Sequence, residues 1–194
     1  MDPLLGVFSA FGLSASAGLN AYIPLLVVGV LAHYTDLIKL SSPWDALANP
    51  WILIMLGLLL IIEMLADKVP AVNHINDLIQ TIVRPAAGAI AFAASTNVIH
   101  GIHPLVAMAC GLLVAGSIHL VKSAAVRPLV TVATGGAGNV PVSIAEDATA
   151  TAMSFLAVLV PVAIAVIVAI LILLMLWWWA RRTSKNTDAN SIHP

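Results

Sequence analysis

Ionisable residues are scarce in this sequence, and those in its central part stand at the ends of apolar runs. The 194 residues include 8 Lys and Arg and 9 Asp and Glu, whereas 61% are hydrophobic. An ionisable group in or near the hydrocarbon of a bilayer is costly, so it is by default a candidate functional group. The candidate polar site therefore comprises Glu63, Asp67, Lys68, Asp77, Arg84, His119, Lys122, Arg127, Glu146 and Asp147.

The acidic members of this set have the chemistry to bind a cation or to exchange a proton. Burial and mutual repulsion both favour the protonated form of a carboxyl group, which suits proton coupling. The basic residues are as numerous as the four carboxylates considered for this role, which are Glu63, Asp67, Glu146 and Asp147. Structural ion pairs that hold helices in register are therefore the alternative. We expect one carboxylate to stay free, and we expect it to be Glu63, because it lies ~20 Å along a helix from Pro50.

Uncharged polar residues near predicted helix breaks, or on a polar helix stripe, are candidate substrate ligands. Helix N-termini at such breaks favour an anion, whereas freed carbonyl groups favour a cation, and the sequence leaves this choice open. The candidates are Asn20, Asn73, Gln80, Thr134 and Asn139.

The sequence lacks the motifs of the enzyme classes considered. No Gly-x-Ser-x-Gly, P-loop or His-Glu-x-x-His pattern occurs. His100 and His103 lie in a predicted loop without a third ligand, which is weak evidence for a metal site. The Gly-rich run 135–138 has no Lys after it and is interpreted as unwound backbone. We therefore expect no catalytic residue, no metal and no cofactor, and a lipid-handling membrane enzyme ranks third among the functions.

The composition identifies an integral membrane protein. The mean hydropathy is +1.04 and only 9% of the residues are charged, whereas soluble domains are about half apolar and about a quarter charged. The net charge of −1 offers no basic surface for nucleic acid. The single Cys110 excludes a disulfide framework. The expected partners are the lipid bilayer and a small ion or polar solute.

Crossing the hydrocarbon takes about 20 apolar residues, and five segments reach or approach that length. They are residues 4–33, 50–66, 85–99, 102–121 and 162–179. We predict an all-α polytopic helical membrane protein of about five spans, with broken or re-entrant half-helices. Residues 1–182 would form a single membrane domain, and residues 183–194 a disordered polar tail.

Gly, Asn and Pro interrupt the first of these segments, which would be ~46 Å long as one helix. One interpretation is a tilted, kinked helix. The other is two half-helices that meet at an unwound Gly18–Asn20. The same Gly, Asn, Pro order occurs in residues 136–141, and an Arg-Pro pair also occurs twice. These similarities hint at an internal repeat, which is common in transporters.

Residues 71–84 are predicted to form an amphipathic helix, because apolar and polar side chains follow separate stripes. The apolar stripe is Val72, Ile75, Ile79 and Ile82, and the polar stripe is Asn73, Asp77, Gln80 and Arg84. Two placements remain open. The helix lies in the membrane interface, or it is tucked into the protein as a re-entrant element whose polar stripe faces a cavity.

The remaining helices are predicted from prolines, glycines and small residues. Pro85 is expected to begin a short helix to about Asn97, and a further helix covers residues 104–122. Ala87, Ala91 and Ser95 suit close helix contact. Residues 123–147 are the least helix-like apolar part. Ser143 to Glu146 resembles a capping box. Residues 145–160 would be a surplus half-helix, or a kinked extension of the following span, that carries Glu146 and Asp147 over the site.

Several of these residues together resemble a known family. The strings are Glu63-x-x-x-Asp67-Lys68-Val69-Pro70, Asp77, Arg84-Pro85-x-x-Gly88, His119-x-x-Lys122 and Glu146-Asp147. They are similar to a group of small multi-pass bacterial membrane proteins known as a domain of unknown function. The resemblance covers about residues 10–160 and departs at 128–143, where Gly-rich sequence replaces an Asn-, Ser- and Pro-rich stretch. It implies that the polar residues form a set, and it implies no activity.

These observations favour a small membrane transporter or channel-like protein that is proton- or ion-coupled. The alternative is a non-catalytic membrane scaffold or accessory subunit. Lys and Arg are balanced between the two sides of a five-span arrangement, so the positive-inside rule does not fix the orientation. An antiparallel homodimer would explain this balance. If the inner basic residues belong to the site, Arg181, Arg182 and Lys185 place the C-terminus in the cytoplasm, at a bacterial inner membrane.

Overall fold

The computed structural model describes residues 3–67, 70–96 and 102–160, and every regular element in these ranges is helical. The helices are α1 (Pro3–Leu19), α2 (Tyr22–Tyr34), the short 3₁₀ helix η1 (Trp44–Ala48), α3 (Pro50–Ala66), α4 (Pro70–Thr96), α5 (Pro104–Val121), the π-helical turn η2 (Lys122–Val126) and α6 (Arg127–Thr134). A last helix covers Asn139–Val160. The all-α prediction is thus confirmed for the described part. The predicted span 162–179 and the tail 183–194 lie outside it.

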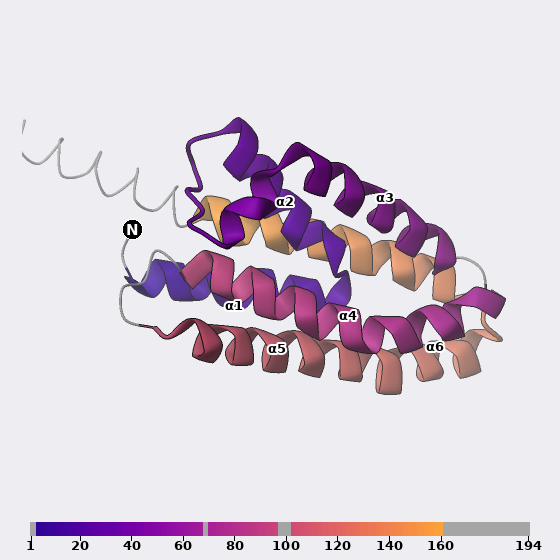
Figure 1. The fold of residues 1–194 in the computed structure, drawn as a ribbon. Helices are drawn as coiled ribbons and strands as arrows, with labels where there is room; N and C mark the ends of the chain where they lie inside the picture. The colour runs from indigo at the N-terminus through magenta and orange to yellow at the C-terminus, as the bar shows by residue number, and fades with distance from the viewer. Residues whose placement is uncertain (1–2, 68–69, 97–101, 161–194) are drawn as a thin grey trace, which may run out of the picture.

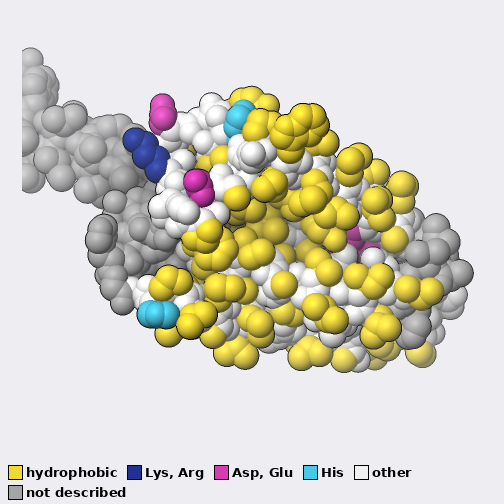
Figure 2. Space-filling view, in the orientation of Figure 1, with side chains coloured by type: hydrophobic (Ala, Val, Ile, Leu, Met, Phe, Trp, Pro, Cys, Tyr) yellow, Lys and Arg dark blue, Asp and Glu magenta, His cyan; other side chains and the backbone are white. Residues whose placement is uncertain are grey.

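Much of the outer surface of this helical bundle is apolar, and most of the Asp, Glu, Lys and Arg side chains of its described residues are buried. Ile82 is 76% exposed and Leu113 is 69% exposed, whereas Arg84 is fully buried. Figure 2 shows hydrophobic side chains over most of one face. Three described helical stretches are long and apolar enough to cross a membrane, namely Ile75–Ser95, Pro104–Thr134 and Asn139–Val160. Water would not tolerate such a surface, but hydrocarbon does. The protein is an integral membrane protein.

Helices α1, α4 and α5 pack most closely, and they lie side by side in Figure 1. Small residues permit this approach. A Cβ atom on Gly88 would lie 2.2 Å from the Ala115 Cβ, and one on Gly111 would lie 2.3 Å from the Gly88 carbonyl oxygen. Ser14 adds a buried hydrogen bond to the Gly111 carbonyl oxygen (2.7 Å). Ala91, in the predicted small-residue stripe, is fully buried. Such contacts stabilise helix pairs in lipid, where the hydrophobic effect does not.

The first apolar segment forms two helices, because the helical conformation is interrupted between Leu19 and Tyr22. The Asn20 side-chain oxygen accepts hydrogen bonds from the backbone N–H groups of Tyr22 (3.0 Å) and Ile23 (3.2 Å). It therefore caps α2 as a helix N-cap residue does. Of the two open interpretations, the pair of helices is correct. The break lies after Gly18, which is in α1 and packs against the Ala115 carbonyl oxygen of α5.

Helix α4 differs from the prediction, because it continues through Pro85 instead of beginning there. Proline is tolerated within membrane helices because neighbouring groups can satisfy the freed carbonyl. The predicted amphipathic helix is the first half of α4. The described part of its polar stripe faces the protein, with Gln80 2% exposed, and the described part of its apolar stripe faces outward, with Ile79 54% exposed. Among the two open placements, this burial argues against a helix whose polar face meets water.

Helix α5 also continues beyond its predicted end at Lys122, through η2 and α6 to Thr134. In η2 the Arg127 backbone N–H bonds to the Lys122 carbonyl oxygen. In a π turn the backbone hydrogen bond joins residues i and i+5, so these two residues lie near the same face of the helix. In a regular α-helix, five residues would step about 140° past a full turn. The π turn therefore explains why the Lys122 and Arg127 side chains are both buried.

A short glycine turn reverses the chain after α6. Gly135 (φ 61°) and Gly136 (φ 91°) have positive φ angles, which glycine adopts without a Cβ penalty. The predicted interruption is correct, but the last helix already begins at Asn139. Ser143 is therefore inside this helix, so the predicted capping box is wrong. The predicted element 145–160 is helical, but it belongs to a longer helix that already begins at Asn139. Its relation to the predicted span after Pro161 lies outside the described residues. Ser16 anchors the last helix to α1 through the Ala150 carbonyl oxygen (2.8 Å).

Candidate functional site: a buried ionic network

The fold gathers most of the predicted ionisable residues into one buried network. Glu63 and Asp67 come from the end of α3, and the turn η2 and the start of α6 contribute Lys122 and Arg127. The other members come from α4, α5 and the last helix, and they are Asp77, Arg84, His119, Glu146 and Asp147. All except the half-buried Asp77 have less than a tenth of their surface exposed. Lys68 lies outside the described residues.

The first part of the network is centred on Arg84. Its guanidinium lies 2.8 Å from Glu63 Oε1 and 3.2 Å from His119 Nδ1. Arginine only donates hydrogen bonds, so His119 Nδ1 must accept and the imidazole proton is on Nε2. That nitrogen lies 3.2 Å from the Thr81 hydroxyl, which in turn donates to the Asp77 backbone carbonyl (2.9 Å). The chain of donors and acceptors is consistent with a neutral imidazole.

The second part is centred on Arg127, which contacts several carboxylates at once. Its guanidinium lies 2.9 Å from Asp67 and 3.3 Å from both Asp77 and Glu146. Glu146 also pairs with Lys122, at 2.7 Å. One carboxylate is therefore shared by two bases. A buried charge is tolerated only when it is paired and hydrogen-bonded, and this cluster meets that condition.

The break after α1 is connected directly to this network. Lys122 Nζ donates to the Leu19 carbonyl oxygen (3.0 Å), one of the carbonyls freed where α1 ends. Asn20 uses its oxygen to cap α2 and its amide nitrogen to donate to Asp147 Oδ1 (2.9 Å). The two ends of the broken segment thus bind a base and an acid respectively.

Asp147 is the acid whose environment differs from the rest. No Lys, Arg or His of the described ranges lies within ion-pair distance of it, and Asn20 is the partner of its carboxylate. The prediction that Glu63 is the free carboxylate is wrong, because Arg84 pairs with it. Distance along the helix located Glu63 in the interior, but it could not reveal that Arg84 of α4 faces it.

Three buried polar atoms around the first part have no hydrogen-bond partner within the described ranges. They are Glu63 Oε2, Gln80 Oε1 and Arg84 Nε. These atoms belong to side chains of α3 and α4. Buried polar atoms are seldom left without a hydrogen bond, so these three atoms are available to a water molecule or a polar ligand.

Other predicted ligands are placed elsewhere. Thr134 and Asn139 belong to the glycine turn, where Thr134 accepts from the Gly138 N–H (2.8 Å) and Asn139 bonds to Thr131 (3.0 Å). They hold the turn together and do not join the network. Asn73 lies on α4, but its side chain is outside the described part of the structure. Among the described residues, no cluster of three His, Cys, Asp or Glu could hold a metal ion.

Besides Thr81, which bonds to His119, sequence reasoning missed Asn76 and Ser143. Asn76 donates to Asp67 Oδ1 (2.7 Å), and Ser143 donates to Asp67 Oδ2 (3.1 Å). Ser143 stands three and four residues before Glu146 and Asp147, which on a helix places them on one face. That signal was available in the sequence. It was missed because Ser143 was assigned to a helix cap.

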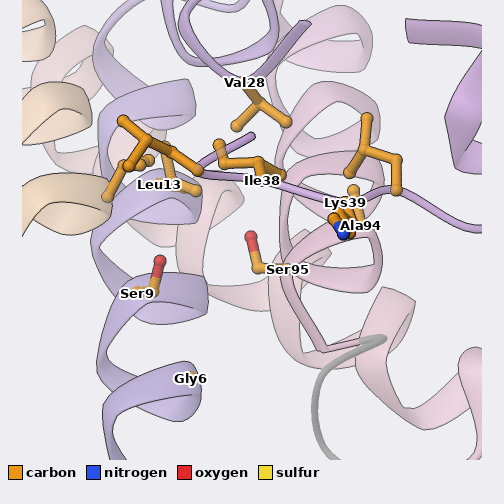
Figure 3. A pocket seen from close by; sticks show the side chains of 11 residues that line it. Gly6, Ser9, Leu13, Val28, Ile38, Lys39, Ala94 and Ser95 are labelled. Carbon is orange, nitrogen blue, oxygen red and sulfur yellow. The ribbon is translucent and has the colours of Figure 1, made fainter. Parts of the chain in front are cut away.

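Two hollows lined by described residues differ in character. A groove of about 430 Å³ has Asp147 on its wall, and Figure 2 shows acidic colour recessed within the apolar face. A smaller cavity of about 70 Å³ includes Ser9, Ser95 and Lys39 in its lining and no acidic residue. Figure 3 shows Ser9 and Ser95 on the wall of this cavity. Only the larger hollow reaches the ionic network.

Comparison with known proteins agrees with the resemblance found in the sequence. No curated protein and no solved structure matches the chain significantly. One family model matches residues 7–181, which include every described member of the network, and it is described as a domain of unknown function, DUF4126. The match is wider than the expected 10–160 and includes the Gly-rich departure. The chain therefore belongs to the DUF4126 family of uncharacterised domains.

Proposed function

We propose that this protein is a small ion-coupled membrane transporter whose central site is the buried ionic network. The observation that carries the proposal is the unequal pairing of charges inside a bundle with an apolar exterior. Within the described residues, the acids Glu63, Asp67, Asp77, Glu146 and Asp147 face the bases Arg84, Lys122 and Arg127. A purely structural network has no need of an excess of buried acid, because each unpaired carboxylate costs desolvation energy. An excess of acid does suit the binding of a proton or cation.

The shared contacts offer a way to couple binding to rearrangement. Glu146 lies 2.7 Å from Lys122 and 3.3 Å from Arg127. A proton on Glu146 would release one base, which could then pair with another acid. Lys122 also holds the end of α1 through Leu19 (3.0 Å). A change in the charge of Glu146 would therefore be transmitted to the broken α1–α2 segment, and broken helices around a central site are typical of transporters.

The unpartnered atoms beside Arg84 support a polar occupant. Glu63 Oε2 and Gln80 Oε1 accept hydrogen bonds, whereas Arg84 Nε–H donates one. A water molecule or a small polar solute could satisfy donors and acceptors together. This part of the network would then hold the water molecule or solute, while its ion pairs keep the helices in register.

Flux through sealed liposomes tests the proposal. Purified protein is reconstituted with a pH-sensitive dye inside, and gradients of protons and of inorganic cations are imposed in turn. We expect protein-dependent flux that falls at least 10-fold in Asp147→Asn. The matched control is Asp45→Asn, which removes the same charge from an exposed residue of η1, and it should keep wild-type flux.

A membrane scaffold is the second candidate, and the dense pairing of the other acids favours it. Glu63, Asp67, Asp77 and Glu146 each lie within 3.3 Å of an Arg or Lys. In a scaffold, no gradient produces flux, and Asp147→Asn changes only stability or assembly. Absence of flux with every ion, from protein that is folded and inserted, would overturn the transporter proposal in favour of the scaffold.

A further inference from the structure

The groove beside Asp147 has features that point to a particular class of ligand. It is bordered by α2, α3 and the last helix, through Ile23, Val27, Leu60, Met64, Ile144 and Ala148. Asp147 is one of the residues that line it, and 9% of the surface of this residue is exposed. Among the described residues, Asn20 is the hydrogen-bond partner of the carboxylate and it occupies Oδ1, which leaves Oδ2 available to a ligand.

We propose that this groove binds a hydrophobic organic cation, with its apolar groups against the helices and its positive charge beside Asp147. This inference rests on the proposed function and names the substrate class of that site. The argument is charge complementarity, because the carboxylate has no cationic partner among the described residues and its surroundings are apolar. A volume of about 430 Å³ falls in the range of small-molecule sites.

Other ligand classes fit this groove less well. A bare inorganic cation needs several oxygen ligands, but besides Asp147 the other polar lining residue is Thr151. Its hydroxyl already donates to the Asp147 backbone carbonyl (2.8 Å). An anion would be repelled by Asp147, and Glu146 stands next to it in the chain. An uncharged acyl chain would fill the groove but leave the carboxylate uncompensated.

Two probes of the same shape and opposite charge test this selectivity. Radiolabelled tetraphenylphosphonium and tetraphenylborate are equilibrated with the full-length protein in lipid nanodiscs, and empty nanodiscs give the partitioning background. We expect saturable binding of the phosphonium above background and none of the borate. Asp147→Asn should weaken phosphonium binding at least 10-fold, whereas Asp45→Asn should leave it unchanged.

A second variant distinguishes loss of the binding site from misfolding. Ala148 is exposed and lines the groove, so Ala148→Phe should fill the groove while it keeps the carboxylate. It should also weaken phosphonium binding at least 10-fold, with an unchanged unfolding midpoint. Equal binding of both probes, or phosphonium binding that survives both variants, would overturn the proposal.

The outcome is separable from that of the transporter proposal. Proton or ion flux without selective phosphonium binding would keep the transporter and reject this ligand class. Selective phosphonium binding without any flux, including flux of the phosphonium itself, would keep the binding site and reject transport.

Discussion

Glu63 and Asp147 are both buried carboxylates, but their hydrogen-bonding and ion-pair partners differ. Glu63 faces Arg84 at 2.8 Å, and Arg84 is held in turn by His119. Asp147 has the amide of Asn20 at 2.9 Å and the wall of a groove. The Glu63 region therefore compensates its charge with a neighbouring base, whereas in the Asp147 region no Lys, Arg or His of the described ranges lies within ion-pair distance of the carboxylate. Under the functions proposed above, the first region positions helices and the second binds a ligand.

Breaking the compensated region should produce the largest loss of stability. Removing one partner of a buried ion pair typically costs about 3–5 kcal/mol. Arg84→Gln leaves Glu63 charged and removes the donor to His119, so we expect a loss in that range. The double variant Glu63→Gln/Arg84→Gln removes both charges and should be about 1–3 kcal/mol more stable than Arg84→Gln alone. Denaturant unfolding in detergent micelles measures both. A double variant no better than the single one would contradict the pairing.

Substitution of Asn20, which links Asp147 to the interruption between α1 and α2, should give the second-largest loss of stability. Asn20→Ala removes the cap of α2 and the hydrogen bond to Asp147, and we expect it to cost about 2–3 kcal/mol. Asn20→Ser is the matched control, because serine caps helices well but is too short to reach Asp147. It should recover about half of the loss. Equal losses in the two variants would show that capping is not part of the role of Asn20.

Changing the uncompensated region should have a small effect on folding. Asp147→Asn keeps the shape and one hydrogen bond, so we expect the free energy of unfolding to change by no more than about 1.5 kcal/mol. The same variant should lose flux, as proposed above. Asp147→Asn should therefore lose flux with little loss of stability, whereas Arg84→Gln should lose stability. A loss of 3 kcal/mol or more by unfolding would place Asp147 among the structural charges instead.

The sequence predicted the members of the network better than their pairing. Charges at the ends of apolar runs are costly in lipid, which is why composition alone selects Glu63, Arg84 and Lys122. Pairing depends on which helices are neighbours, and no local pattern specifies that Arg84 of α4 faces Glu63 of α3. The free carboxylate was consequently assigned to the wrong residue.

The predicted helix boundaries were wrong for a related reason. The sequence predicts a helix start at Pro85 and a segment of low helical tendency around Pro128, because in water proline disrupts a helix interior. In this bundle α4 continues past Pro85, and a π turn absorbs the disruption before Pro128. Glycine was the more reliable signal. Gly135 and Gly136 adopt positive φ angles at a real reversal of the chain, which depends on local geometry alone.

The π turn allows the smallest and most specific test. If η2 contains one residue more than a regular helix needs, deleting Ala125 should convert it into an α turn and leave Lys122 and Arg127 four residues apart, on one face. Ala125 is exposed, so we expect a stability change within about 1 kcal/mol. Deleting the exposed Leu113 from α5 instead should rotate every later side chain by about 100° and carry Arg127 away from Asp67. Unfolding midpoints of the two deletions separate these outcomes. If both deletions were equally harmful, the π turn would not be what places Lys122 and Arg127 in one network.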